Sequence, residues 1–369
     1  MLYYLFEYLN KTYNPPGFDL FRFITFRSAM AAITALIISF WLGPKIIGYL
    51  QKHQIGEAKK ADGPKNHWSK AGTPTMGGII IILSGVVPAV LWGDILNVYM
   101  WLILLGTLWL FGVGFLDDYL KVIKKLPNGL IARYKLLGQV GIGLIVGVTI
   151  YLSGDFSGYN TMTTMPFLKN VNLDLGILYI PAVIFIVTAT SNAVNLTDGL
   201  DGLAIGLITI VMLALAVLCY VSGNAIYSKY LNIMYLPGSG ELTIYVAALA
   251  GAGLGFLWYN SYPAQVFMGD TGSLALGGAF GIMAVLIKKE LFIPILGAVF
   301  FIETLSVIIQ RLYFKYTKKK YGEGRRVFKM APIHHHFEQL GWPEPKIVTR
   351  FYIVGIIFAI ITLVSFKIR

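Results

Sequence analysis

The chain has 369 residues, of which 56% are hydrophobic and only 13% are charged. Because soluble domains carry about a quarter of their residues as charged side chains, this composition excludes an ordinary soluble protein and predicts a polytopic membrane protein. The formal net charge of +12 does not indicate a nucleic-acid partner, because the basic residues cluster between apolar stretches. The single cysteine, Cys219, leaves no internal disulfide and no thiolate metal site to consider.

Apolar stretches of about 20 residues, the length that crosses a bilayer as a helix, recur along the chain. The first 20 residues precede them as an interfacial segment, with no cleavable signal peptide expected. Ten spans are predicted, over residues 23–50, 76–95, 98–115, 134–152, 175–193, 202–221, 242–259, 272–287, 291–313 and 348–366. We therefore expect residues 1–369 to form one all-α transmembrane domain, with a long loop over residues 312–347.

The basic residues of the connecting segments predict the orientation. Connectors after the first, third and ninth spans are rich in lysine and arginine, whereas those after the even-numbered spans carry few. The positive-inside rule then places the odd-numbered connectors, including the 312–347 loop, in the cytoplasm and both termini in the periplasm. Four basic residues run against this rule without outweighing the other connectors, namely Lys288, Lys289, Lys367 and Arg369.

Five polar stretches interrupt the apolar pattern, and two spans separate each from the next. They cover residues 62–78, 114–135, 191–202, 258–273 and 331–338. Because two crossings return the chain to the same side, all five are expected at the cytoplasmic face. The sequence thus predicts a site assembled from the cytoplasmic ends of several helices.

Two acidic motifs suggest phosphate chemistry. Asp117 and Asp118 follow the third span with Lys121 one helical turn further on, so that a carboxylate can hold a divalent cation or accept a proton; a solvated helix end is the simpler alternative. Asp270 begins the eighth span, where a helix N-terminus attracts phosphate and a carboxylate suits the Mg²⁺ that accompanies it. Helix capping by Asp270 or Ser273 is an alternative that is compatible with metal binding.

The stretch 191–202 places polar side chains at three-residue intervals, namely Asn192, Asn195, Asp198 and Asp201. Such spacing keeps Asp198 and Asp201 on one side of a helical turn, and nearby glycines let the backbone approach a ligand. The competing interpretations are a glycine-rich turn and glycosylation of Asn195, which the predicted cytoplasmic location disfavours.

Three consecutive histidines, His334, His335 and His336, lie in the last polar stretch. Consecutive side chains fan out in different directions, so we do not expect a zinc site built from all three. We favour contacts from one or two of them to phosphate oxygens over a solvated loop. In the ninth span, Glu303 and Gln310 lie on one helical stripe that either bonds to other helices or lines a cavity.

Together these motifs resemble those of the polyprenyl-phosphate N-acetylhexosamine-1-phosphate transferases. The resemblance runs from residue 62 to residue 338 with the motifs in the same order. The acidic blocks at 117–118, 195–202 and 269–273 are similar to those of the whole superfamily. The stretches 72–78 and 332–338 resemble its muramoyl-pentapeptide branch.

The resemblance implies transfer of phospho-N-acetylmuramoyl-pentapeptide from uridine diphosphate to undecaprenyl phosphate in the bacterial inner membrane, with release of uridine monophosphate and a requirement for Mg²⁺. It implies that Asp270 binds the metal, and that Asp117, with Asp118 beside it, acts as base, nucleophile or organiser. The residues implied around uridine and sugar are Asn192, Asn195, Asp198, Asn260 and Phe267. Those implied around phosphates and sugar are Lys70, Thr75, Asp201, Gln310, His334 and His335. Lys121 and His336 are further candidates for substrate binding.

Two other functions are weighed against this one. An N-acetylglucosamine-1-phosphate transferase of the same superfamily is disfavoured by the triple histidine. A secondary transporter is disfavoured because its polar residues would lie near the membrane midplane, often in repeated halves, whereas these lie at helix ends. A homodimer is possible, and its existence is not predicted by any feature of the sequence.

Overall fold

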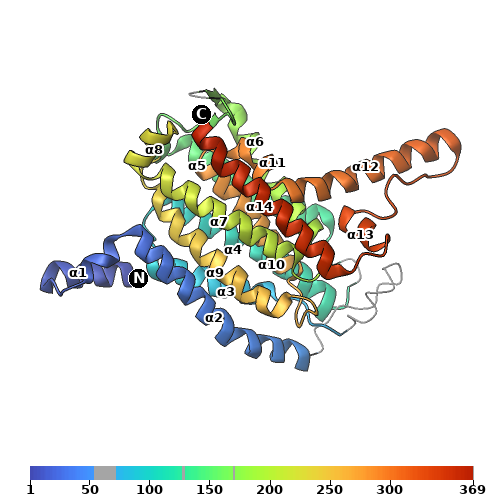
Figure 1. The fold of residues 1–369 in the computed structure, drawn as a ribbon, viewed down its shortest axis with the longest axis horizontal. Helices are drawn as coiled ribbons and strands as arrows, with labels where there is room; N and C mark the ends of the chain where they lie inside the picture. Colours follow the sequence, from blue (N-terminus) through green and yellow to red (C-terminus); the bar gives the residue numbers. More distant parts are fainter. Residues whose placement is uncertain (54–71, 127–128, 169–170, 369) are drawn as a thin grey trace.

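The protein is described here by a computed structural model that covers residues 1–53, 72–126, 129–168 and 171–368. It is a bundle of long helices (Figure 1). Among these described residues, eight helices are long and apolar enough to cross a membrane, and one bent pair would make nine. These observations confirm the prediction of an all-α multi-pass membrane protein.

A helix lies at each of the ten predicted spans. These helices are α2 (Ile24–Lys52), α3 (Gly78–Trp92), α4 (Val98–Asp118), α5 (Ala132–Leu152), α6 (Tyr179–Thr197), α7 (Leu203–Ser222), α9 (Leu242–Asn260), α10 (Gly269–Leu286), the pair α11 (Ile293–Leu296) and α12 (Ala298–Tyr321), and α14 (Glu344–Ile368). Helix α3 has 15 residues. At 1.5 Å per residue it is about 22 Å long, less than the roughly 30 Å of a hydrocarbon core. The count of ten crossings therefore stays a prediction.

Helix α10 lies at the centre of the bundle, with α3, α4, α6 and α7 packed around it. All of its residues from Thr271 onward are buried. Glycines permit this close packing, because a Cβ on Gly78 of α3 would overlap the backbone of Gly272 and one on Gly114 of α4 would overlap the carbonyl of Asp270. The start of α10 is thereby held in backbone contact with both neighbouring helices.

The two chain termini lie at the end of the bundle opposite the polar stretches, on the left in Figure 1. Met1 donates its ammonium group to the carbonyl of Leu91, at the end of α3 remote from Gly78. At the start of α14, Glu344 accepts a hydrogen bond from the backbone of Asp201, which belongs to the polar stretch 191–202. The structure therefore agrees with termini on a common side, whereas the assignment of that side to the periplasm stays a prediction.

The N-terminal segment forms a helix, α1 (Leu2–Tyr13), that has no buried residues and extends away from the bundle (Figure 1). Pro15 and Pro16 follow it and separate it from α2. On the same side, α8 (Ala225–Leu231) is a short helix between α7 and α9.

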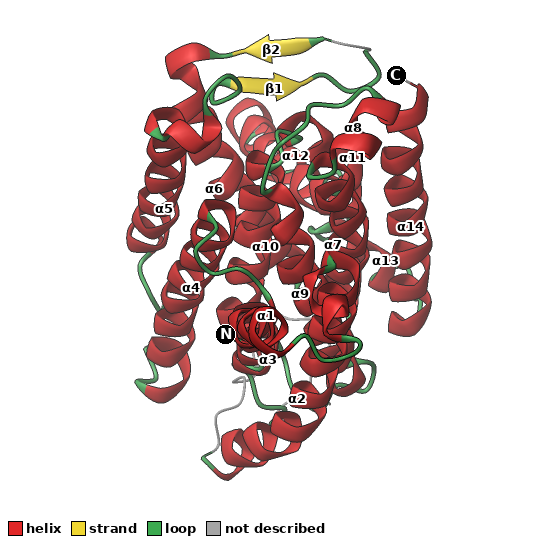
Figure 2. Ribbon diagram, turned by 90° about the vertical axis from the view of Figure 1, so that its left-hand side faces the viewer, coloured by secondary structure: helices red, strands yellow, loops and turns green. Residues whose placement is uncertain are grey.

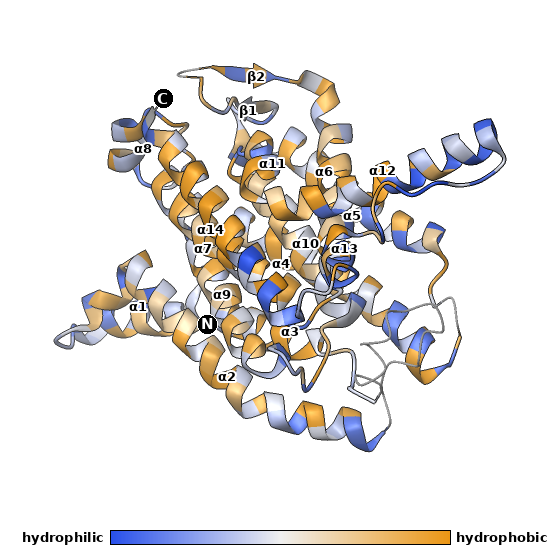
Figure 3. Ribbon diagram, turned by 45° about the vertical axis from the view of Figure 1, so that its right-hand side comes forward, coloured by the Kyte–Doolittle hydropathy of each residue, from blue (hydrophilic) through white to orange (hydrophobic). Residues whose placement is uncertain are grey.

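The ninth predicted span differs from the structure. Instead of one segment over 291–313, α11 and α12 are bent by 82° on either side of Gly297. Helix α12 then continues to Tyr321 and projects from the bundle, and its outer part is largely hydrophilic (Figure 3). The prediction of a loop from residue 312 was wrong because hydropathy marks where an apolar segment ends, not where a helix ends. A further short helix, α13 (Ile333–Glu338), lies in the predicted loop.

A small hairpin between α5 and α6 was not predicted. Strands β1 (Met162–Thr164) and β2 (Asn172–Asp174) pair in antiparallel fashion, with Thr163 opposite Leu173 (Figure 2). Strands of three residues are too short to give a recognisable alternation of polar and apolar residues.

The turn after α10 explains Lys288, one of the residues that run against the positive-inside rule. Lys288 is buried and donates to the carbonyl of Asn160 at 2.9 Å and to the hydroxyl of Tyr179 at 2.7 Å. Tyr179 in turn donates to Glu290 at 2.6 Å, and Glu290 also accepts from Thr163 of β1. Burial lowers the pKa of Lys288 to about 8. The lysine is thus part of a buried polar cluster rather than a charge that flanks a span.

Candidate active site

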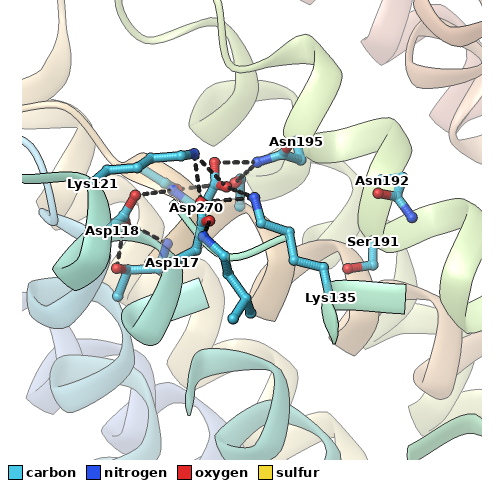
Figure 4. Close-up of polar contacts among 12 residues, drawn as sticks. Asp117, Asp118, Lys121, Lys135, Ser191, Asn192, Asn195 and Asp270 are labelled. Carbon is cyan, nitrogen blue, oxygen red and sulfur yellow. Dashed lines mark hydrogen bonds and ion pairs between the residues drawn. The ribbon is translucent and has the colours of Figure 1, made fainter. Parts of the chain in front are cut away.

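Three carboxylates from two helices form the centre of the candidate site (Figure 4). Asp117 and Asp118 are the last two residues of α4, and Asp270 is the second residue of α10. One oxygen of each carboxylate lies within 4.8 Å of the others. The packing of α4 against α10 thus brings together two segments that are 152 residues apart in sequence.

Two lysines lie between these carboxylates. The Nζ atom of Lys121 is 2.5 Å from Asp117 Oδ2 and 3.2 Å from Asp270 Oδ2. The Nζ atom of Lys135, in the first turn of α5, contacts the same two oxygens at 2.7 and 2.6 Å. Lys135 was not predicted as a site residue because, in sequence, it is one of several basic residues in a cytoplasmic connector. Its place in the polar stretch 114–135 was the available signal.

Asp118 caps the N-terminus of α10 from a different helix. Its carboxylate accepts hydrogen bonds from the backbone N–H of Asp270 at 3.3 Å, and from the N–H and hydroxyl of Thr271 at 2.8 and 2.6 Å. The sequence also allowed a cap supplied by Asp270 or Ser273, neither of which makes that contact. Because Asp118 supplies it, the Asp270 side chain remains directed toward the two lysines.

Asn195 completes the surroundings of Asp270. Its Nδ2 atom lies 2.8 Å from Asp270 Oδ1 and 2.8 Å from the hydroxyl of Ser273. One turn earlier on α6, Asn192 instead donates to Gln139 of α5 at 2.9 Å and lies away from the carboxylates (Figure 4). The structure thus brings Asn195, but not Asn192, to the acidic cluster.

The segments before α3 and α10 run side by side at the edge of the site. The backbone N–H of Phe267 donates to the carbonyl of Pro74 at 2.8 Å, and Gly77 donates to the carbonyl of Phe267 at 2.8 Å. These bonds bring the buried Thr75 beside Gly269, at which a Cβ would lie 2.9 Å from the threonine hydroxyl. Lys70 lies outside the described residues.

Asp201 and Asn260 support the segment that leads to Phe267. Asp201 accepts a hydrogen bond from the N–H of Ala264 at 3.0 Å. Asn260 accepts from the N–H of Gly202 at 3.1 Å and donates to the carbonyl of Val266 at 2.8 Å. Both side chains are almost fully buried, so these contacts indicate a positioning role, which the sequence analysis did not separate from direct substrate contact.

His334 joins the triple-histidine segment to two other parts of the chain. Its Nδ1 atom is 3.0 Å from an oxygen of Glu303 on α12, and both side chains are fully buried. A Cβ at Gly199 would overlap the other side of its ring, which places that ring against the residue next to Asp198. A carboxylate at Nδ1 fixes the orientation of an imidazole and leaves its Nε2 atom directed elsewhere.

The other two histidines have local partners. His335 Nδ1 is 2.6 Å from Glu338 Oε2, and His336 Nδ1 accepts from the N–H of Lys329 at 3.1 Å. The three rings therefore point to three different partners, as expected from their adjacency in sequence.

Gln310 of α12 holds the chain that returns from the end of that helix. Its Oε1 atom accepts from the N–H groups of Val327 and Phe328, each at 3.0 Å, and its Nε2 atom donates to the carbonyl of Phe328 at 3.1 Å. The amide thereby fixes the segment that precedes the histidines.

The acidic cluster suits a divalent cation. Mg²⁺ is bound by one or two carboxylates together with water and substrate oxygens, and Asp117, Asp118 and Asp270 can each offer an oxygen within a small volume. Since Asp118 is occupied by the cap of α10, Asp270 and Asp117 are the better candidates. Anionic substrate groups would compete with these carboxylates for Lys121 and Lys135.

Comparisons with known proteins agree with this geometry. Residues 100–288 match the family model of glycosyl transferase family 4, and residues 70–82 match signature 1 of the phospho-N-acetylmuramoyl-pentapeptide-transferases. Proteins of that name from Salinibacter ruber, Chloroherpeton thalassium and Flavobacterium psychrophilum are 53%, 52% and 48% identical to this chain, each over the full length of both proteins. The chain belongs to the phospho-N-acetylmuramoyl-pentapeptide-transferase family.

Family membership confirms the resemblance that the motifs suggested. The region matched by glycosyl transferase family 4 contains all three clustered carboxylates and both lysines. The transferase signature contains Thr75, at the edge of the site. The histidine segment lies beyond both matched regions, so its contribution is argued from the contacts of His334 alone.

Proposed function

We propose that this protein transfers phospho-N-acetylmuramoyl-pentapeptide from its uridine diphosphate carrier to undecaprenyl phosphate, forming lipid I and uridine monophosphate in the bacterial inner membrane. Full-length identity of about one half to proteins named for this transferase activity supports the assignment. The structural observation that carries it is the cluster of carboxylates bridged by two lysines at one end of a membrane bundle.

In the reaction, an oxygen of the lipid phosphate forms a bond to the phosphorus that bears the sugar. The bond from that phosphorus to the bridging oxygen of the uridine monophosphate breaks, and the leaving phosphate carries away the electron pair. The acceptor is already an anion, so the protein mainly has to position two anionic groups and stabilise their charge. Lys121 and Lys135 are placed for that task, because each contacts both Asp117 and Asp270.

Asp270 and Asp117 are the proposed ligands for Mg²⁺, which when bound would stabilise the negative charge of the phosphates. Asp118 is proposed to position Asp270 through its cap on α10. Asn195 orients the same carboxylate from α6.

For Asp117, the contacts support the role of organiser. Its carboxylate is fully buried; Oδ1 accepts from the N–H of Leu130 at 2.7 Å, and Oδ2 contacts both lysines. Attack on phosphorus by Asp117 would require these contacts to be broken. A burst of uridine monophosphate on mixing enzyme and donor without lipid would instead demonstrate a covalent intermediate and contradict the organiser role.

The remaining predicted residues are proposed to surround the donor, with the ring of His334 against Gly199, the residue that follows Asp198. Direct contacts are proposed for Thr75, Asn195, Asp198, Phe267 and His334, and supporting roles for Asp201, Asn260, Gln310, His335 and His336. Lys70 is proposed to contact phosphate on the strength of the family resemblance. Asn192 is a weaker candidate because it bonds to Gln139.

The activity is tested by incubating purified protein with undecaprenyl phosphate, Mg²⁺ and one of two donors. Uridine monophosphate should be released with the N-acetylmuramoyl-pentapeptide donor. Release with only the N-acetylglucosamine donor would assign the chain to the other branch of the superfamily. Release with neither would reject the transferase proposal and favour a transport function.

A further inference from the structure

A cavity of about 500 Å³ lies between α12 and the chain that returns along it, outside the acidic cluster. Its helical wall is formed by Val307, Arg311, Phe314 and Lys315, and Arg326 and Met330 line the opposite wall. Gln310 fixes the separation of the two walls, since its amide makes three hydrogen bonds to Val327 and Phe328. The cavity is thus a built feature rather than a gap beside a loose segment.

The charged residues of this cavity are all basic: Arg311, Lys315 and Arg326. Within the described part of the chain, none of the three forms an ion pair with an acidic side chain, and Arg326 makes a hydrogen bond of 3.4 Å to the carbonyl of Lys329. Arg311 and Lys315 are four residues apart on α12 and therefore lie on one face, where like charges repel. An anionic ligand would relieve that repulsion, and the apolar walls would accommodate its aliphatic parts.

The cavity begins on α12 one helical turn from the residue that holds the histidine segment. Val307 lies one helical turn beyond Glu303, and Glu303 holds His334. The ring of His334 lies against Gly199, next to Asp198. A donor whose nucleotide and sugar occupy the Asp198 region can therefore extend toward Arg311 without crossing the acidic cluster.

Given the proposed function, we propose that this cavity binds the pentapeptide of the donor and that its three cations recognise the peptide's carboxylate groups. A pentapeptide attached through its amino end has a free carboxylate at the other end, in addition to any acidic side chain. Cations spread over both walls suit several separated carboxylates better than the single phosphate of the lipid acceptor. That phosphate has to reach Asp117 and Asp270 instead.

The test compares the full donor with a uridine diphosphate N-acetylmuramic acid donor that has no peptide. Arg311→Ala and Lys315→Ala should each raise the KM for the full donor about tenfold, the loss expected when one charge-assisted contact is removed. The KM values for the truncated donor and for undecaprenyl phosphate should not change. Arg311→Lys should recover part of the loss, and Lys319→Ala, on the same helix but outside the cavity, should match the unaltered protein.

The proposal of a peptide site would be overturned by a rise in the KM for both donors or by a rise in the KM for undecaprenyl phosphate. It would also be overturned if no KM value changed. If the unaltered protein does not turn over the truncated donor, calorimetric titration of each donor into each variant gives the same comparison from dissociation constants. Failure of the proposed function would be distinct, because the unaltered protein would then release no uridine monophosphate from the full donor. The melting temperature of each variant checks that the exposed substitutions leave the fold intact.

Discussion

Each carboxylate of the acidic cluster has a different set of neighbours. Asp118 accepts hydrogen bonds from the first turn of α10. Asp117 contacts a backbone N–H and two lysines. Asp270 contacts the same two lysines and Asn195. Asp270 also retains some exposure, 17% of its side chain, whereas Asp117 has none. The geometry therefore makes Asp270 the carboxylate most accessible to a metal ion and substrate.

Asp270→Asn should reduce turnover to an undetectable level. The amide keeps the size of the side chain and its contact with Asn195 but loses the charge that attracts Mg²⁺ and the lysines. Release of uridine monophosphate measures the loss, and an unchanged melting temperature in detergent shows that the protein is folded. Turnover that persists in folded Asp270→Asn protein would contradict the assignment.

Lys135→Met should lower kcat by about 10²-fold, the effect of removing one preorganised electrostatic contact to a developing charge. Lys124→Met provides the matched control, because Lys124 is an exposed lysine of the same connector and makes no contact with the cluster. The kcat of both variants is measured by steady-state kinetics. Equal rates for the two would mean that Lys135 is only a basic residue of the connector.

The acidic residues of the site were predictable from the sequence, but the contacts that their neighbours make were not. Asp117, Asp118, Asp270 and Asn195 were expected in the site and lie together. Asn192 shares the spacing of Asn195 but lies one turn nearer the middle of α6, where it meets Gln139. The contact between His334 and Glu303 was not predictable because it depends on how the returning chain packs on α12.

The helices were largely predictable because hydropathy reports the length of each apolar segment. A helix is present at all ten predicted spans. Hydropathy does not report where a polar helix continues, so the outer part of α12 was missed. Nor does it report a bend such as that at Gly297, which depends on packing.

The hairpin and the turn after α10 provide a test of stability at the level of elements. Glu290→Ala removes the buried carboxylate that accepts hydrogen bonds from Tyr179 and Thr163, and each buried donor left without a partner costs about 1–3 kcal/mol. We expect a clear fall in melting temperature, whereas Glu323→Ala, at an exposed position, should have little effect. Because the cluster lies at the end of the bundle opposite the site, kcat per folded molecule should be unchanged at low temperature. An unchanged melting temperature would show that the cluster does not stabilise the turn.

For the whole molecule, the charge of the connectors and the common side of the termini predict that the site faces the cytoplasm. Labelling of single introduced cysteines tests this, since the native Cys219 is buried. In intact cells an impermeant maleimide should label Lys11→Cys, on α1, but should label Lys319→Cys, on α12, only after permeabilisation. The opposite pattern would invert the topology.

The central claim is that the acidic cluster transfers a phospho-sugar from a nucleotide to a lipid. The most direct measurement follows donor labelled in its sugar into a butanol-extractable lipid and counts the uridine monophosphate released. With undecaprenyl phosphate present, the account predicts one uridine monophosphate for each labelled lipid, and no product after Mg²⁺ is removed with a chelator or in Asp270→Asn protein. Uridine monophosphate without labelled lipid, or labelled lipid formed equally by Asp270→Asn protein, would contradict it.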